Sequence, residues 1–134
     1  MSTDAIVSYA SISPFARGDG VETRLMIGRD RVDDPPFTTG TTIFPAGMKA
    51  PMHSHNCDEQ ATVLEGRAMA EVAGVQTELG PMDTSFIPKD MPHRFLNIGD
   101  GPLKILWSYA AAHVTRTFTE TGETVPHLSA GDKV

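Results

Sequence analysis

Gly47-Met-Lys-Ala-Pro-Met-His-Ser-His-Asn-Cys-Asp-Glu-Gln-Ala-Thr-Val-Leu-Glu-Gly66 is the stretch of sequence that decides the fold. His53 and His55 are two residues apart, so on a β-strand both side chains point to the same face, about 7 Å apart along the strand. Residues 56–58 are suited to a tight reversal, because Asn and Asp bond their own backbone there. Glu59 is then expected to open the neighbouring antiparallel strand and to bring a carboxylate oxygen to the imidazoles. Two neutral nitrogens and one anionic oxygen suit a divalent first-row metal ion.

Two residues of the same stretch are alternative ligands. Gln60 could replace Glu59, but adjacent strand residues point to opposite faces, so only one of them can reach the site, and the carboxylate is the stronger oxygen donor. Cys57 is a second alternative because thiolates bind soft metals. A cysteine in the reversal is expected to point outward or to pack as a small hydrophobic residue.

A fourth candidate ligand lies in a second stretch, residues 80–97. His93 follows a proline-rich turn and begins an alternating run, in which Phe95 and Asn97 share its face. This alternation predicts a strand that carries an imidazole toward the same interior as the first pair. Asn97 is expected to support that strand.

The two stretches resemble the paired motifs of the cupin superfamily, whose members are small antiparallel β-barrels that hold a metal inside. The first motif is Gly, five residues, His-x-His, three or four residues, Glu, six residues and Gly, and it is matched at Gly47, His53, His55, Glu59 and Gly66. The second is Gly, five residues, Pro-x-Gly, two residues, His, three residues and Asn. It is matched at Pro88, His93 and Asn97, while Met82 and Asp90 stand where the family has glycine. These two departures fall in turns and leave the ligand positions intact.

The resemblance implies a double-stranded β-helix with His53, His55, Glu59 and His93 around one metal ion. It does not distinguish Fe, Mn, Ni and Zn, because these divalent ions share such ligands and availability decides among them. Homodimers are common among small cupins, so the resemblance also implies a homodimer.

The pattern of the whole chain predicts an all-β sandwich or barrel without reference to the family. Strand-length segments are punctuated by turn residues, and no convincing helical period is present. Outside the first motif, strands are expected at residues 5–9, 22–28, 37–44, 67–72, 75–79, 84–87, 93–98, 103–110 and 114–118. The chain of 134 residues is expected to form one domain, residues 1–134, with its core barrel at about residues 37–110. In the flanking tail, an edge strand at residues 114–118 could pair across a homodimer.

The strand at residues 103–110 predicts part of the wall of the cavity. Leu103, Ile105, Trp107 and Tyr109 share one face, which is expected to look into the barrel with Trp107 near the metal. The rival register would turn Leu106 inward. Phe95 is expected to line the same cavity, and Met48 and Met91 to lie at its mouth. His113 and His127 match no motif and are interpreted as solvated or packed side chains.

The composition excludes several classes of partner. A net charge of −6 and a pI near 5.2 argue against non-specific binding to nucleic acid or to anionic membranes. The single cysteine rules out a disulfide within the chain and fits a reducing compartment. The sequence shows no signal peptide and no apolar stretch long enough to cross a bilayer, so a cytoplasmic protein is expected.

Three histidines and one carboxylate would leave two open positions on an octahedral ion, where a substrate can bind through two oxygens. The first hypothesis is therefore a metal-dependent enzyme that acts on a small oxygenated molecule. The resemblance leaves dioxygenase, isomerase and lyase or decarboxylase chemistry open, and no separate catalytic acid or base stands out. The alternative is a non-catalytic cupin that binds or senses a small ligand. A metal-free sugar-nucleotide epimerase type is a third hypothesis, against which the intact ligand set argues.

Overall fold

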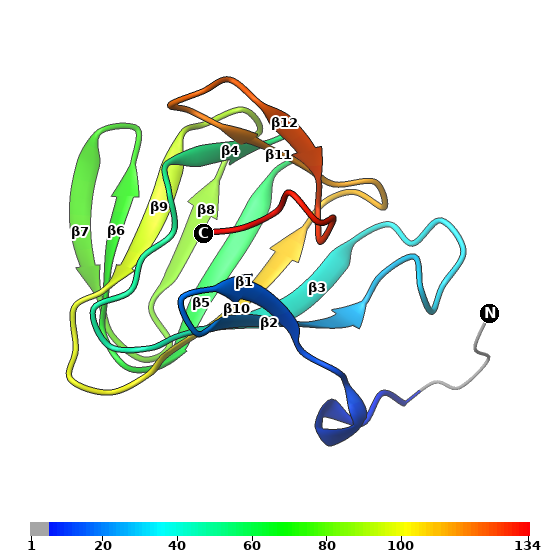
Figure 1. Cartoon of the computed structure of the whole chain (residues 1–134), viewed down its shortest axis with the longest axis horizontal. Helices are drawn as coiled ribbons and strands as arrows, with labels where there is room; N and C mark the ends of the chain where they lie inside the picture. The colour runs from blue at the N-terminus through cyan, green and yellow to red at the C-terminus, as the bar shows by residue number, and fades with distance from the viewer. Residues whose placement is uncertain (1–5) are drawn as a thin grey trace.

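The computed structural model describes residues 6–134, which fold into two antiparallel six-stranded sheets that face each other (Figure 1). The first sheet has the strand order β1-β2-β3-β10-β5-β8, and the second has the order β12-β11-β4-β9-β6-β7. The predicted all-β jelly roll is confirmed. The described residues contain one short 3₁₀ turn, η1 (Tyr9–Ser11), besides the strands.

The strand bounds agree with most of the expected ranges. The first sheet is built from β1 (Phe15–Gly18), β2 (Val21–Ile27), β3 (Thr38–Phe44), β10 (Leu103–Tyr109), β5 (Glu59–Glu65) and β8 (Thr84–Ile87). The second is built from β12 (Thr124–Pro126), β11 (Thr115–Phe118), β4 (His53–His55), β9 (His93–Asn97), β6 (Ala68–Val72) and β7 (Val75–Leu79).

The core lies between the sheets because the inward side chains of the central strands are apolar. In β10, burial alternates strictly along the strand, and the buried set is Leu103, Ile105, Trp107 and Tyr109. The rival register, with Leu106 inward, is wrong. Each buried side chain of this kind contributes about 1.5–3 kcal/mol relative to an exposed one.

Turn chemistry explains how the short strands reverse. Strands β6 and β7 pair from Val72↔Val75 outward, and the two loop residues, Ala73 and Gly74, both have positive φ, as a type I′ hairpin requires. Met82 and Asp90, which replace glycines of the cupin motif, also have positive φ, at 72° and 66°. The turns therefore keep the backbone shape that glycine favours, although these side chains make that shape more costly.

Three expectations about the flanking segments are wrong. Residues 6–8 form no strand, and η1 follows them because Ser11 Oγ and Ser11 N both bond the carbonyl of Ser8. The start of that expected strand, Ala5, lies outside the described residues. The expected strands leave residues 10–21 outside any strand, but β1 forms there because it pairs with β2. Strand β11 is not an edge strand, because β4 and β12 occupy its two sides. The homodimer itself stays a prediction.

The expected pairing of the two strands of the first motif, β4 and β5, is also wrong. Their actual placement determines where the candidate ligands lie. Strand β4 lies between β11 and β9 in the second sheet, whereas β5 lies between β10 and β8 in the first. Residues 56–58 therefore carry the chain from one sheet to the other. Asn56 fastens this crossing by donating to His113 O at 2.8 Å and accepting from Thr115 N at 2.8 Å. Glu59 consequently faces the histidines across the barrel.

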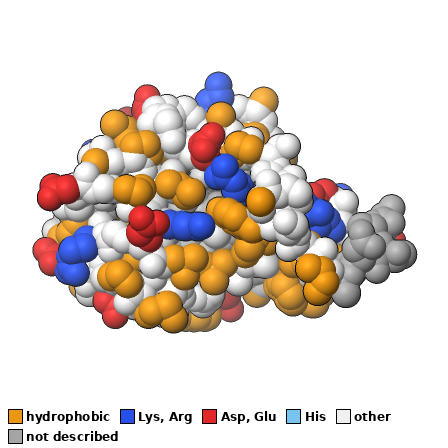
Figure 2. All heavy atoms as spheres, turned by 90° about the horizontal axis from the view of Figure 1, so that it is seen from below, with side chains coloured by type: hydrophobic (Ala, Val, Ile, Leu, Met, Phe, Trp, Pro, Cys, Tyr) orange, Lys and Arg blue, Asp and Glu red, His pale blue; other side chains and the backbone are white. Residues whose placement is uncertain are grey.

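The outer surface is mixed in character. Figure 2 shows one face on which hydrophobic side chains are interspersed with acidic and basic ones and no histidine is visible. Among residues 6–134, no helix has the length and hydrophobicity needed to cross a bilayer.

A substitution at Gly66, the last residue of the first motif, tests how closely the backbone packs at this turn. It has φ +89°, and a Cβ there would lie 2.5 Å from Pro102 O. We expect Gly66→Ala to lower the free energy of unfolding by roughly 2–4 kcal/mol, because the positive φ and the backbone clash both oppose the side chain. Equilibrium unfolding in urea measures the change.

Gly74→Ala is the matched control. Gly74 also has positive φ, at +80°, but an added Cβ would meet nothing within 4 Å. Its cost should therefore be only about 1 kcal/mol. Equal losses in the two variants would show that Pro102 does not constrain this turn.

Candidate metal centre

Three imidazoles meet inside the barrel. His53 and His55 come from β4, and His93 comes from β9, where it pairs directly with His53 across the antiparallel ladder. All three are buried, and one ring nitrogen from each lies within 4.8 Å of the others. His-x-His on a strand thus supplies two nitrogens, and the neighbouring strand supplies the third.

The backbone orients all three rings in the same way. The Nδ1 atoms of His53, His55 and His93 lie 2.7, 3.0 and 2.9 Å from the carbonyl oxygens of Pro51, Thr115 and Met91. A carbonyl can only accept, so each Nδ1 carries a proton, and in a neutral ring this leaves Nε2 as the nitrogen with a lone pair for a metal ion. Metal-binding histidines characteristically donate their other nitrogen in this manner.

Glu59 lies beside this group of three on the opposite sheet, close to two of the imidazoles but outside the set whose ligand atoms are all within 4.8 Å of one another. Its Oε1 lies 3.1 Å from His93 Nε2 and 3.5 Å from His55 Nε2, and the side chain is buried. His55 Nε2 is buried without a hydrogen-bond partner. Buried polar atoms rarely stay unpaired, and here several lone pairs converge on one point. A divalent cation shared by the four side chains would satisfy them together, so this donor set fits a first-row metal ion.

The protonation of the ring nitrogens suits this role. Burial, and next the Arg116 charge, hold the pKa of His53 well below its ordinary value. Burial lowers the pKa of His55 to about 4, although the carboxylate of Glu59 opposes this shift. Both rings are therefore neutral at pH 7, as metal ligation requires.

The two alternative ligands lie elsewhere. Gln60 points away from the histidines and hydrogen-bonds Thr62 on the other side of the sheet. Cys57 is a buried free cysteine outside the group of side chains that could hold an ion together. Burial raises the pKa of its thiol to about 11, which disfavours the thiolate.

The remaining predicted site residues divide into two groups. Phe95 and Trp107 line the cavity beside the histidines. Met48 and Met91 do not line it, and they pack against the core instead. Asn97 lies further along β9, where its side chain donates to Phe44 O and Gly101 O, both at 2.9 Å, and so supports the strand end.

The cavity is small and largely aromatic. Its volume is about 50 Å³, and its wall also includes Tyr109 and Thr42. Trp107 Nε1 donates a hydrogen bond to Thr42 Oγ1 at 2.9 Å. Typical ligand pockets measure about 300–1,000 Å³. A ligand that enters the closed barrel must therefore be very small, or the covering residues must move.

Sequence reasoning missed the charged side of the cavity. Arg17 from β1 and Arg116 from β11 both line it, and both bond Asp132 Oδ1 at 2.9 Å. Only Arg116 carried a partial signal, because it shares a face with Val114 and Phe118 in the expected strand at residues 114–118. Nothing in the sequence indicated that their acidic partner would come from residues 127–134.

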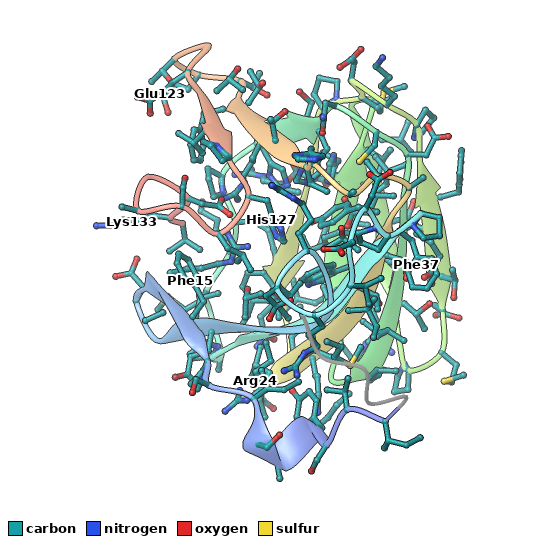
Figure 3. All side chains as sticks on the ribbon, turned by 90° about the vertical axis from the view of Figure 1, so that its right-hand side faces the viewer. Phe15, Arg24, Phe37, Glu123, His127 and Lys133 are labelled. Atoms are coloured by element: carbon teal, nitrogen blue, oxygen red, sulfur yellow. The ribbon has the colours of Figure 1, made fainter. Side chains whose placement is uncertain are left out.

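His127 is the first residue of the segment 127–134, which covers the cavity. Its ring packs edge-on against Trp107 and Tyr109 with centroids 5.1 Å apart in both cases, and its Nε2 accepts from Arg17 Nη2 at 3.4 Å. In Figure 3, His127 points inward toward the strands while Lys133 on the same segment points outward. The interpretation of His127 as a packed side chain is confirmed.

The comparisons with known proteins agree with this geometry. Residues 40–109, just over half of the chain, match the model of the cupin domain family. The chain belongs to the cupin family. This cupin is 32% identical over 99 residues to the uncharacterized protein MJ1618 of Methanocaldococcus jannaschii, a match that covers 73% of this chain and 79% of that protein.

Solved structures share the fold of this cupin at lower identity. An RmlC-like cupin from Shewanella frigidimarina has a TM-score of 0.70 at 16% identity, over 82% of this chain and 93% of its own. Oxalate oxidase has a TM-score of 0.72 at 16% identity, over 85% of this chain and 63% of its own. This cupin therefore spans less than two thirds of oxalate oxidase, and likeness at this identity concerns the fold alone.

His127 provides a pH-dependent test of the covering segment. Burial, and next the charge of Arg17, lower the pKa of His127 from 6.5 to about 3. Between about pH 3 and pH 6.5, the unfolded chain therefore binds more protons at this imidazole than the native protein does. His127 therefore stabilises the fold fully above pH 6.5, and this contribution is lost as the pH falls, by up to roughly 1.4 kcal/mol per pH unit.

We expect the stability of His127→Gln to depend less steeply on pH than that of the wild type between pH 6.5 and 4. Urea unfolding of chelator-treated protein measures both slopes. His113→Gln removes an exposed imidazole and should retain the wild-type slope. Parallel curves for His127→Gln and the wild type would contradict the partly buried, neutral state of this ring.

Proposed function

We propose that this cupin is a metal-dependent enzyme that acts on a small oxygenated molecule inside the barrel. The observation that carries the proposal is the common orientation of His53, His55 and His93. All three Nδ1 atoms are committed to backbone carbonyls, the three rings are close enough to share one ion, and Glu59 Oε1 lies 3.1 Å from His93 Nε2. Such an arrangement is costly for a protein to maintain unless a cation occupies it.

His53, His55, His93 and Glu59 would hold the metal. A divalent ion with four protein ligands retains open positions and supplies a Lewis acid to a bound oxygen ligand. Zinc, iron, manganese and nickel all accept nitrogen and oxygen donors of this kind.

The remaining wall has a separate task. Phe95, Ile105 and Trp107 form an apolar surface beside the histidines, so they exclude water and strengthen the electrostatic interactions of a bound ligand. The Trp107 ring packs against Gly40, where an added Cβ would lie 2.7 Å from two of its ring atoms. The wall is therefore rigid, as a positioning surface should be.

The family relationship supports an enzymatic function without naming the reaction. Oxalate oxidase, an enzyme whose fold resembles this one, acts on a small oxygen-rich molecule. A cupin that binds a small ligand without turnover is the alternative, and it shares the same metal and the same cavity.

Metal content is the first test. We expect protein purified without added metal to contain close to one first-row ion per chain by elemental analysis. His55→Ala and His93→Ala should each reduce the occupancy at least about tenfold, because each removes a ligand from a buried set. His113→Ala, a control at an exposed histidine, should leave it unchanged.

Two results would overturn the metal site: equal occupancy in all three variants, or wild-type protein that takes up none of the four metals. Turnover then separates the two functions. Product formation from a panel of small hydroxy, keto and dicarboxylic acids supports the enzyme. A small ligand that is retained through purification and released unchanged supports the binding protein.

A further inference from the structure

Two arginines and one aspartate form a buried cluster next to the histidines. Arg17 and Arg116 come from opposite sheets, and each forms an ion pair with the same oxygen, Asp132 Oδ1, at an Nη1–Oδ1 distance of 2.9 Å. Asp132 is fully buried, and the arginines are 7% and 3% exposed. Burial alone would raise the pKa of Asp132, but the two guanidinium charges outweigh it and hold the pKa below its ordinary value. One carboxylate thus serves two cations, and one positive charge of the cluster is left without an acidic partner.

The cluster borders the candidate metal centre directly. Arg116 Nη2 lies 3.4 Å from His53 Nδ1, and both arginines line the same cavity as the histidines and Glu59. The charges of the two arginines are balanced by those of Glu59 and Asp132. A divalent ion at the histidines would therefore leave an excess of two positive charges, which favours an anionic ligand.

Asp132 reaches the arginines from a segment that is held by few bonds. We name residues 127–134 the lid; it follows β12 and crosses the space between the two sheets (Figure 1). Three backbone bonds tie it to the barrel: His127 N to Val114 O at 2.9 Å, Ser129 N to Pro126 O at 3.1 Å and Val134 N to Arg17 O at 3.2 Å. Its other backbone bonds are mostly internal, such as Asp132 N to Ser129 O.

The lid closes over the cavity through its side chains. His127 points inward against the aromatic wall, as Figure 3 shows, and Val134 is part of the cavity lining. Asp132 Oδ2 also accepts from Leu128 N at 2.7 Å, which fixes the carboxylate within the lid. The same two arginines also donate to lid carbonyls, Arg116 Nη1 to Lys133 O at 2.9 Å and Arg17 Nη1 to Asp132 O at 3.3 Å. A ligand that engaged both guanidinium groups would therefore release several contacts of the lid together and enlarge a cavity of only about 50 Å³.

We propose that Arg17 and Arg116 form a carboxylate-binding subsite, and that Asp132 of the lid occupies it until a small carboxylate ligand displaces it. The inference deepens the proposed function, because it assigns the small oxygenated molecule to the class of organic acids. The arginine fork recognises one carboxylate, and the acid's remaining oxygens are directed to the histidine side of the cavity. Because the resident carboxylate is tethered, it competes at high effective concentration and weakens the apparent affinity of an incoming acid.

The subsite can be tested without metal, by calorimetric titration of chelator-treated protein with malonate. Malonamide, which has the same shape without charge, is the matched ligand. We expect Asp132→Asn to bind malonate about tenfold more tightly than the wild type at low ionic strength, because the neutral amide holds the arginines less firmly. Asp100→Asn removes one exposed negative charge outside the cavity wall and should bind as the wild type does. Adding Arg116→Gln to Asp132→Asn should abolish the gain.

A second measurement covers the case in which Asp132→Asn does not fold. In the wild type, malonate should accelerate hydrogen exchange at the Leu128 amide, whose acceptor is Asp132 Oδ2, and malonamide should not. The subsite is overturned if malonate binds neither protein or leaves Leu128 protected, or if malonamide binds equally well. It is also overturned if the gain persists without Arg116.

The two proposals fail separately. Malonate binding that depends on Arg116, in a protein that takes up no metal, removes the proposed metal function and leaves the subsite standing. Full metal occupancy with no effect of Asp132→Asn on malonate removes the subsite and leaves the metal function standing.

Discussion

The crossing at residues 56–58 is the constraint on which the site depends. Within three residues the chain leaves the second sheet after His55 and enters the first at Glu59. The side chain of Asn56 bonds the backbone on both sides of Val114, and Asp58 Oδ1 accepts from Lys89 N at 2.8 Å. These bonds fix the separation of the sheets at the point where the ligands face each other. Imidazoles on one sheet and a carboxylate on the other can then share one centre.

The second level of order comes from main-chain carbonyls. Each of the three histidines donates Nδ1–H to a carbonyl near β4 or β9, so ring orientation follows from backbone position and needs no further side chain. Pro51 and Met91 each stand two residues before the histidine they orient. Local geometry therefore sets two of the three tautomers, whereas that of His55 depends on Thr115 in β11.

The buried charges on the other side of the cavity follow different physics. Removing two guanidinium groups and a carboxylate from water costs several kcal/mol per ion, and their attraction repays this cost only with close geometry and additional hydrogen bonds. Here the extra bonds exist, from Arg17 Nε to Thr23 Oγ1 and from Arg116 Nη1 to Lys133 O. Such a cluster contributes little net stability. It specifies one position of the lid, and it places a carboxylate where a ligand's carboxylate fits.

The sequence determined the class of the fold and the residues of the histidine centre, because both depend on local periodicity. His-x-His must share a strand face, Leu103 to Tyr109 must alternate, and Ala73-Gly74 must turn. The sequence could not predict which distant segments pair, because the backbone hydrogen bonds between strands do not depend on residue type. Only the tertiary structure decided that β4 and β5 lie in different sheets and that β11 is paired on both sides. It alone decided that Asp132, 115 residues from Arg17, completes the cavity. The physical reason is that a buried ion pair is selected by proximity in the folded chain, and proximity is set by the closure of the whole barrel.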